Sequence, residues 1–347
     1  MKALVYHGPG QRVWEEVPAP VIQDPADAVV RVDAVTICGT DLHILKGDVP
    51  EVKPGTILGH EAVGTVVEAG AGVRTVRPGD RVLVSCITAC GRCRYCRAGT
   101  YGQCLGGGGW ILGHTIHGTQ AEQVRVPFAD TSVYRLPHDV DDARALLLAD
   151  ILPTAYEVGV LKGRVTPGDT VAVVGAGPIG LAAITTARLY SPASIIAIDP
   201  AAARREAARR AGADLVLEPG EDVPDTVRAA TDGLGADVAI EAVGVPATFE
   251  ECTRLVRPGG HVANIGVHGG PATLHLEDLW VRDITVTTGL VDTFSTPTLL
   301  RMVAAGRLDP DWMITHRLGL PEIQDGYDAF TDPNGSGALK VALFGTG

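Results

Sequence analysis

Short apolar runs with a period close to two dominate the first 150 residues of the chain. Glycine and proline interrupt these runs at short intervals, and Pro78-Gly79-Asp80 is typical of a tight turn. Alternation of this kind predicts the strands of a compact antiparallel domain. The expected strands are Ala28–Val35, Ala62–Ala69, Arg81–Val84 and Ala121–Val126, preceded by a first strand in the segment Met1–Gly8.

From about Thr170 the pattern changes to fully apolar runs that are separated by helical stretches of about a dozen residues. This alternation predicts an α/β domain with a doubly wound parallel sheet. The expected strands are Thr170–Val174, Ser194–Ile198, Leu215–Leu217, Asp237–Ala242, His261–Ile265 and Ile284–Thr288, and the clearest helices are Ile179–Tyr190 and Ala201–Ala211. After about Val291 the alternation stops, and we expect one further helix, Thr296–Ala305, before the chain returns to the first domain.

The composition fits a folded protein of two domains. The chain has 347 residues, of which 46% are hydrophobic and 20% charged, and this balance excludes a disordered chain. Its 43 glycines follow no triplet repeat, which excludes a collagen-like chain. Acidic residues number 41 and basic residues 29, so the formal net charge is -12. A surface of this sign argues against nucleic acid and anionic membranes as partners.

The sequence also predicts a cytoplasmic location. No segment approaches the roughly 18 apolar residues that a membrane span needs. The N-terminal segment lacks the apolar core of a signal peptide. In a reducing compartment, clustered cysteines indicate a metal site more often than disulfides.

Four of the seven cysteines are clustered. Cys90, Cys93, Cys96 and Cys104 are separated by two, two and seven residues. Four thiolates suit a closed, tetrahedral structural zinc site. An iron–sulfur cluster uses the same four ligands, and four free thiols are the third interpretation. Cys86 and Cys252 are interpreted as buried thiols.

A glycine-rich turn follows the apolar strand that ends at Val174. Its residues are Gly175, Gly177, Pro178, Ile179 and Gly180. The first glycine permits a tight turn, the second lets the backbone approach a pyrophosphate, and the third allows close helix–strand packing. Asp199 ends the next strand, 19 residues beyond Gly180, where a ribose-binding carboxylate belongs. The alternative is a purely structural glycine turn.

A second group of metal-binding residue types lies in the first domain. Cys38 opens the sequence Cys-Gly-Thr-Asp-Leu-His, and His60 and Glu61 follow about twenty residues later. Spacing alone leaves two interpretations open, a metal site or a core thiol and a buried imidazole.

These motifs together resemble the zinc-dependent medium-chain alcohol dehydrogenases, in the order in which that family carries them and over essentially the whole chain. The pattern is closest to bacterial secondary-alcohol dehydrogenases. The resemblance implies a GroES-like, mainly β catalytic domain formed by residues 1–151 and 292–347. It implies a Rossmann NAD-binding domain formed by residues 152–291.

The resemblance further implies that Cys38, His60 and Asp150 are the ligands of a catalytic zinc ion. Asp150 stands where the best-known members have a cysteine, and its alternative interpretation is a solvated acid. Glu61 matches a residue that the family uses as an occasional or exchanging ligand. The four clustered cysteines match the family's structural zinc site.

Proton transfer in the family implies roles for three residues of the first motif. Thr40 matches the group that takes the alcohol proton, and His43 the end of that relay. Asp41 matches a carboxylate that orients His60. The alternative interpretation of a threonine and an aspartate in a turn is helix capping.

On the coenzyme side, Thr154, Arg204, Val243 and Gly244 match positions that contact the coenzyme in relatives, and Lys340 is expected to contact pyrophosphate. Packing and solvation are the alternative roles of such residues. Asp199, followed by a proline rather than an arginine, favours NAD over NADP.

The implied activity is hydride transfer between NAD and an alcohol/ketone pair, preferably a secondary alcohol and its ketone. The implied cofactors are NAD(H) and two zinc ions per chain. A polyol or L-threonine dehydrogenase of the same superfamily is the alternative. From a different class, a crystallin-like or RNA-binding relative without activity would be expected to lose the catalytic zinc ligands. The expected partner is a small-molecule substrate, and the expected assembly a homo-oligomer, a tetramer rather than a dimer.

Overall fold

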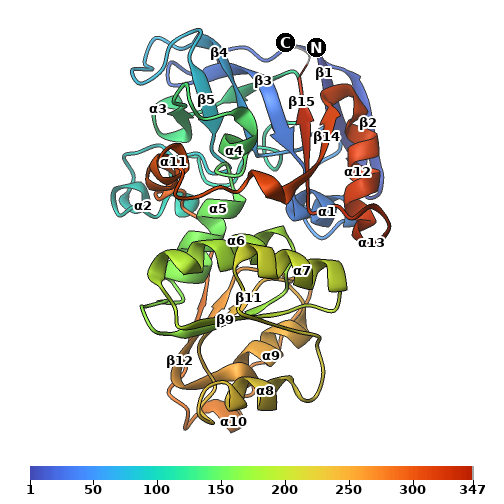
Figure 1. Ribbon diagram of the computed structural model, residues 1–347. Coiled ribbons are helices and arrows are strands. Elements are labelled where there is room, and N and C mark those ends of the chain that lie inside the picture. The colour runs from blue at the N-terminus through green and yellow to red at the C-terminus, as the bar shows by residue number, and fades with distance from the viewer. Residues whose placement is uncertain (346–347) are drawn as a thin grey trace. The chain divides into compact units, whose positions relative to one another are not determined.

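The computed structural model describes residues 1–345, apart from the side chain of Asn334, and it divides into two compact units (Figure 1). The first unit contains Met1–Pro153 and the residues from Val291 on, and the second contains Thr154–Leu290. The first boundary lies two residues after the predicted one, and the second lies one residue before it. Among the described residues, no helix is long and apolar enough to cross a membrane.

A seven-stranded sheet forms the centre of the first unit. Its order is β14-β15-β3-β4-β5-β7, and β6 also pairs with β3. The pairs are antiparallel except for β14 and β15, which are parallel. The strands are β3 (Ala28–Thr36), β4 (Ala62–Ala69), β5 (Arg81–Val84), β6 (Gln123–Val126), β7 (Val133–Arg135), β14 (Ile314–Gly319) and β15 (Lys340–Phe344), and a separate hairpin consists of β1 (Lys2–Gly8) and β2 (Gln11–Glu16).

Most helices of the first unit are short. They are α1 (Gly39–Lys46), α2 (Arg94–Arg97), α3 (Ala129–Ser132), α4 (Asp142–Leu146), α5 (Ile151–Thr154, which ends at the unit boundary), α11 (Thr296–Ala304), α12 (Ile323–Thr331) and α13 (Pro333–Ser336), with 3-10 turns η1 (Tyr101–Gln103), η4 (Asp311–Met313) and η5 (Leu320–Glu322). The structure ends α11 one residue before the predicted end of this helix.

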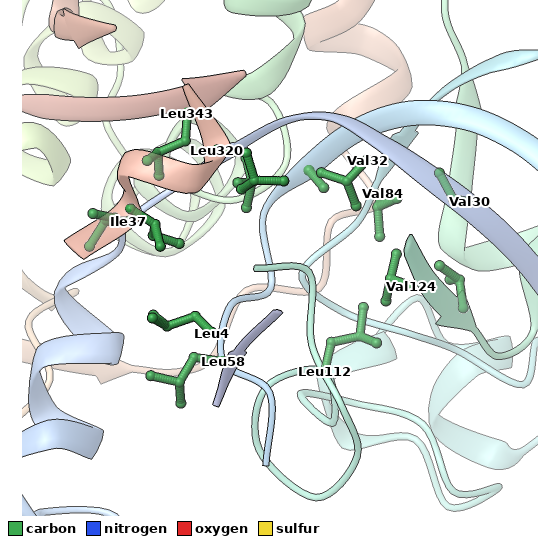
Figure 2. Close-up of a cluster of buried hydrophobic side chains, with 14 of the residues drawn as sticks. Leu4, Val30, Val32, Ile37, Leu58, Val84, Leu112, Val124, Leu320 and Leu343 are labelled. Atoms are coloured by element: carbon green, nitrogen blue, oxygen red, sulfur yellow. The ribbon is translucent and has the colours of Figure 1, made fainter. Parts of the chain in front are cut away.

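The period of two in the sequence places the core of the first unit. In β3, Val30 and Val32 are buried whereas Arg31 between them is exposed. Leu4, Leu58 and other apolar side chains from strands and loops complete this core (Figure 2). The core therefore fixes the backbone just before α1 and β4, where Cys38 and His60 lie.

The second unit is a parallel sheet with helices. Its six strands have the order β10-β9-β8-β11-β12-β13, and every pairing is parallel. The strands are β8 (Thr170–Val174), β9 (Ser194–Ile198), β10 (Leu215–Leu217), β11 (Ala236–Glu241), β12 (Val256–Asn264) and β13 (Thr285–Thr288). The helices are α6 (Pro178–Ala187), α7 (Ala202–Ala211), α8 (Val223–Ala229), α9 (Pro246–Leu255) and α10 (Leu276–Leu279), with a π-helix η2 (Ala155–Leu161) and a 3-10 turn η3 (Arg188–Tyr190).

The strand order reverses direction at β8. From this strand the chain first adds β9 and β10 on one side, and then β11, β12 and β13 on the other. In such doubly wound sheets, ligands bind beyond the carboxyl ends of the strands at the reversal. The glycine-rich turn follows β8 directly, so the fold presents it at this position.

Candidate metal centres and coenzyme site

Four residues that are distant in sequence meet in the first unit. Cys38, His60, Glu61 and Asp150 each offer one ligand atom, and these atoms all lie within 4.8 Å of one another. The Nε2 atom of His60 is 3.4 Å from Oδ2 of Asp150, and the same oxygen is 3.6 Å from Sγ of Cys38. The structure thus brings together the three residues expected to bind a catalytic metal and places Glu61 beside them.

Asp41 faces the other nitrogen of His60. Its Oδ1 lies 3.8 Å from Nδ1 of His60, and both atoms are buried without a hydrogen-bond partner among residues 1–345. Its Oδ2 accepts hydrogen bonds from the backbone N–H of Cys38 and from Nε2 of Gln120, each at 2.9 Å. Asp41 also stands in the first turn of α1, so helix capping and orientation of His60 are combined in one side chain.

Glu61 is held by groups that the sequence did not indicate. Both of its carboxylate oxygens pair with Nζ of Lys340, at 2.8 and 2.9 Å, and the hydroxyl of Thr36 donates to one of them. Lys340 and Glu61 are each 1% exposed. This finding corrects the prediction that Lys340 contacts pyrophosphate, because its ammonium group is the buried counter-ion of Glu61.

The charges of this cluster fit a divalent cation. Burial raises the pKa of the Cys38 thiol, and the nearby Glu61 carboxyl raises it further. Burial also raises the pKa values of the Asp41 and Glu61 carboxyls. A cation among these donors would add to the positive charge of Lys340 and favour the ionised forms of these groups. Thiolate, imidazole and carboxylate are all ligand types that zinc accepts.

His60 is protonated more readily in this surrounding than in water. Burial lowers the pKa of its ring, but hydrogen bonds to Asp150 and Cys38 outweigh this effect and raise it well above the usual value. The acceptors around Nε2 thus favour positive charge at this position, which a bound cation would supply.

The two expected relay residues lie on one helix. Thr40 and His43 are three positions apart in α1 and therefore share a face of it. The Thr40 hydroxyl lies 3.7 Å from Sγ of Cys38, and Nδ1 of His43 lies 2.8 Å from Oδ2 of Asp48. The His43 side chain is 23% exposed, so it can exchange protons with solvent.

Cys86 lies closer to this cluster than its sequence context indicated. The side chain is 3% exposed, as expected for a buried thiol, and its Sγ is 3.6 Å from Oδ1 of Asp150. Burial raises the pKa of this thiol well above its usual value. It therefore stays protonated and donates to the carboxylate. Cys252 is fully buried in the core of the second unit.

The second metal cluster is formed by Cys90, Cys93, Cys96 and Cys104, whose sulfur atoms all lie within 4.8 Å of one another. The backbone N–H groups of Cys96 and Leu105 donate to Sγ of Cys93, at 3.4 and 3.3 Å. A side chain at Gly106 would approach Sγ of Cys90 to 2.6 Å, so this position has room only for glycine. The spacing of the cysteines gives no sign of this requirement at Gly106.

The thiols of this cluster have pKa values shifted in opposite directions. The N–H groups of Cys96 and Leu105 lower the pKa of Cys93 to about 6. Burial and the side-chain hydrogen bond to Cys93 raise the pKa of Cys96 to about 12, because a thiol that donates a hydrogen bond keeps its proton. Four thiols within 4.8 Å of one another supply the four ligands of a closed zinc site.

The glycine-rich turn has the close contacts that each glycine was expected to permit. Gly175 has a φ of 99°, and a side chain there would approach Cγ2 of Val243 to 2.5 Å. A side chain at Gly180 would meet the carbonyl oxygen of Gly175 at 1.9 Å, so helix and strand pack tightly here. Gly177 has open space beside it, in front of Pro178 at the start of α6. The first-turn N–H groups, which include that of Ile179, thus face space that a phosphate could fill.

Asp199 stands at the end of β9 and is 2% exposed. Its two carboxylate oxygens accept hydrogen bonds from the N–H groups of Ala176 and Ala201, each at 2.8 Å. These bonds tie it to the glycine-rich turn. The Arg204 guanidinium lies 4.0 Å from Asp199, whereas Arg205 donates to the carbonyls of Asp199 and Pro200.

The expected coenzyme residues near β11 are fixed by Glu241. The N–H groups of Val243 and Gly244 donate to Oε1 of Glu241 at 2.9 and 2.8 Å, and so does the hydroxyl of Thr248 at 2.7 Å. These N–H groups are thus used within the protein, and a coenzyme would meet the Val243 side chain, which is 46% exposed.

A cavity of about 800 Å³ is lined by Val174 and Ile198, from the ends of β8 and β9, and by residues of α8 and α9. Its volume is in the range of small-molecule pockets, but the residues that line it do not include the predicted coenzyme contacts. Thr154, the remaining expected contact, ends α5 at the start of the second unit.

Comparison with known proteins agrees with both units. Residues 24–138 match the family model "Alcohol dehydrogenase GroES-like domain", and residues 178–305 match "Zinc-binding dehydrogenase". An alcohol dehydrogenase from Cupriavidus necator is 38% identical to the chain, and the match covers 99% of this chain and 98% of that protein. The chain belongs to the zinc-dependent medium-chain alcohol dehydrogenases. The resemblance found in the sequence is thereby confirmed, as is the combination of a GroES-like and a Rossmann-like unit.

Solved structures of this alcohol dehydrogenase family share the whole fold. The apo form of zinc dependent alcohol dehydrogenase 2 from Streptococcus pneumonia has a TM-score of 0.96 and 47% identity, over 100% of this chain and 99% of that one. A zinc-binding dehydrogenase from Sinorhizobium meliloti that is bound to NADP has a TM-score of 0.85 and 31% identity, over 99% and 98%. A relative found by sequence, L-threonine 3-dehydrogenase from Pyrococcus horikoshii, is 33% identical, and the match covers 94% of each chain. The family and the two clusters are consistent with two zinc sites and an oxidoreductase activity.

Proposed function

We propose that the protein is a zinc-dependent, NAD-linked alcohol dehydrogenase that interconverts a secondary alcohol and its ketone. The cluster of Cys38, His60 and Asp150 supports this proposal most strongly. It offers three ligands of different types, and Lys340 and Thr36 hold the carboxylate of Glu61. Three protein ligands leave one coordination position for a substrate oxygen, which distinguishes this site from the closed cluster of four cysteines.

A zinc ion in this site would act as a Lewis acid on the substrate oxygen, and bound NAD would accept the hydride. The residues of the chain then transfer the proton and position the reacting groups. In alcohol oxidation, the Thr40 hydroxyl accepts the substrate hydroxyl proton and passes its own toward His43. Asp48 holds Nδ1 of His43, so the ring can accept the proton at Nε2 and release the Nδ1 proton through Asp48 to solvent.

Replacing Thr40 with alanine is expected to lower kcat by roughly 10²-fold, because a positioned proton-transfer group contributes on this scale. The metal content should stay unchanged, since Thr40 is not a proposed ligand. Thr40→Ser keeps the hydroxyl and serves as the matched control, with kcat near that of the unaltered protein. Steady-state kinetics and metal analysis of both variants test the role, and full activity of Thr40→Ala would exclude it.

We propose NAD rather than NADP because of Asp199. A 2′-phosphate would be placed against this buried carboxylate, and like charges at short range repel. The guanidinium of Arg204 lies 4.0 Å from the carboxylate of Asp199, and that of Arg205 is bound to carbonyl oxygens. A neighbour of this fold is bound to NADP, so the choice of NAD rests on Asp199 and not on the fold.

The expected preference for NAD in kcat/KM is at least roughly 10²-fold, which corresponds to about 3 kcal/mol. Asp199→Asn keeps the shape of the side chain and removes its charge. It should therefore raise kcat/KM with NADP and reduce the preference for NAD. Asp199→Gly should reduce this preference further, because it also weakens the binding of NAD. Kinetics with both coenzymes provide the test, and an equal or higher kcat/KM with NADP would overturn the assignment.

A panel of alcohols and ketones, followed by the absorbance of reduced coenzyme, tests the substrate class. Secondary aliphatic alcohols are expected to react best. The L-threonine 3-dehydrogenase relative supports a second candidate, a more polar substrate such as a polyol or L-threonine. Turnover restricted to those substrates would favour this second candidate, and no turnover with any of them would favour a relative without activity.

We also propose that the protein is a cytoplasmic homotetramer. None of its seven cysteines forms a disulfide in the described residues, as expected for a reducing compartment. β13 is an edge strand of its sheet, and the nearby Trp280 and Val281 are 77% and 61% exposed. Unpaired edges and exposed large apolar side chains favour self-association. The mass in solution, measured by light scattering, distinguishes a tetramer from a dimer or a monomer.

A further inference from the structure

The carboxylate that faces His60 is itself held by a buried chain of hydrogen bonds. Asp41 is 0% exposed and leaves only Oδ1 toward Nδ1 of His60. Its orientation therefore depends on what binds Oδ2. One of the two donors to Oδ2 is the backbone of Cys38, which the fold fixes, and the other is the side-chain amide of Gln120.

Gln120 is placed to act as an oriented donor. Its backbone is fixed between Leu4 and Leu58, through bonds of 2.8 and 2.9 Å, and its side chain is fully buried. Its Nε2 donates to Asp41 at 2.9 Å and lies 3.4 Å from the carbonyl oxygen of Thr36. A side-chain amide has a donor end and an acceptor end of almost equal shape. A flipped amide would turn its oxygen toward the carboxylate and repel it.

Tyr327 decides which end of the amide faces Asp41. Its hydroxyl donates to Oε1 of Gln120 at 2.8 Å, which leaves Nε2 for the carboxylate. Tyr327 is on α12, far from Gln120 in sequence, and it is fully buried. The guanidinium of Arg12 lies 4.6 Å above its ring and pairs with Asp328, one residue along α12, so the ring is held on its outer side too.

From these contacts we infer that Gln120 and Tyr327 are positioning residues of the catalytic metal centre. Tyr327 orients the amide of Gln120, the amide orients Asp41, and Asp41 sets the rotation of the His60 ring so that Nε2 points toward Cys38 and Asp150. Groups that orient a metal-binding histidine affect metal affinity without touching the metal. The inference rests on the proposed function, since it assumes that His60 binds zinc.

Release of zinc to a chromogenic chelator, measured on the purified zinc-loaded protein, tests the inference. Gln120→Leu is expected to raise the release rate of the catalytic zinc by about 10-fold to 100-fold, the usual effect of losing such a partner. Tyr327→Phe, which removes only one hydroxyl, should raise it by a smaller factor, on the order of 3-fold to 10-fold. Tyr6→Phe is the matched control, because Tyr6 belongs to the same core, and it should release zinc at the unaltered rate.

The zinc of the four-cysteine site is an internal reference in every sample, since a general loss of folding would release it as well. Faster release of one zinc and unchanged retention of the other supports the inference. If both Gln120→Leu and Tyr327→Phe release zinc at the rate of the unaltered protein, the inference is wrong. If the unaltered protein itself holds no zinc beyond that of the four cysteines, the proposed function fails instead. Should Gln120→Leu not fold, Tyr327→Phe alone decides between these outcomes, and cobalt substitution gives an independent spectrum of the centre.

Discussion

Replacing His60 with alanine is expected to remove the catalytic metal and to lower kcat by at least about 10³-fold. His60 is the only imidazole of the cluster in the described residues, and its Nε2 faces Asp150 at 3.4 Å. Without this ligand, two donors of the proposed set remain, Cys38 and Asp150. The loss of Lewis-acid stabilisation of the reacting oxygen corresponds to several kcal/mol, which gives the stated factor.

Coenzyme binding should survive this substitution, because the glycine-rich turn and Asp199 belong to the second unit. Titration of the protein fluorescence with NADH measures that binding. His138→Ala is a suitable control, since His138 is exposed and outside the cluster. If His60→Ala kept both its zinc and its turnover, the proposed ligand set would be wrong.

Replacing Cys93 with serine is expected to lower the melting temperature by roughly 5–10 °C, before any specific effect on chemistry appears. The four-cysteine site offers four sulfur ligands, and the loop around it is held by N–H groups that point at sulfur atoms. A structural zinc site contributes its binding free energy to folding. Its loss should therefore loosen the loop that contains Cys90 and Cys104.

Arg92→Ser is the matched control for this prediction, because Arg92 is exposed in the same loop and is not a ligand. Thermal unfolding followed by circular dichroism gives the comparison. A Cys93→Ser protein that keeps its melting temperature and loses only turnover would contradict the division of roles between the two clusters.

Local sequence patterns predicted the elements that surround both sites. Apolar runs such as Thr170–Val174 and Ser194–Ile198 coincide with β8 and β9, because buried parallel strands need continuous apolar side chains. The glycine motif likewise predicted the geometry of its turn, because the close contacts at Gly175 and Gly180 are local and leave no room for a side chain. The roles of Asp150 and the relay residues came from the family resemblance, and they stay predictions.

The contacts that hold the metal ligands could not be predicted from sequence. Gln120, Tyr327 and Lys340 act through partners 79 to 279 residues away, and nothing in their local sequence signals this. Cys86 was interpreted as a plain buried thiol because its neighbour Asp150 is 64 residues distant. Such pairs can be recognised only in the folded structure, where the sheet and α12 bring the partners together. The predicted phosphate contact of Lys340 failed for the same reason.

The number of zinc ions per chain tests the central claim most directly, because that claim is one open and one closed zinc site. Elemental analysis of the purified protein should find about two zinc ions per chain. One of them should be absent from His60→Ala. A content near one in the unaltered protein, or iron in place of zinc, would contradict the account.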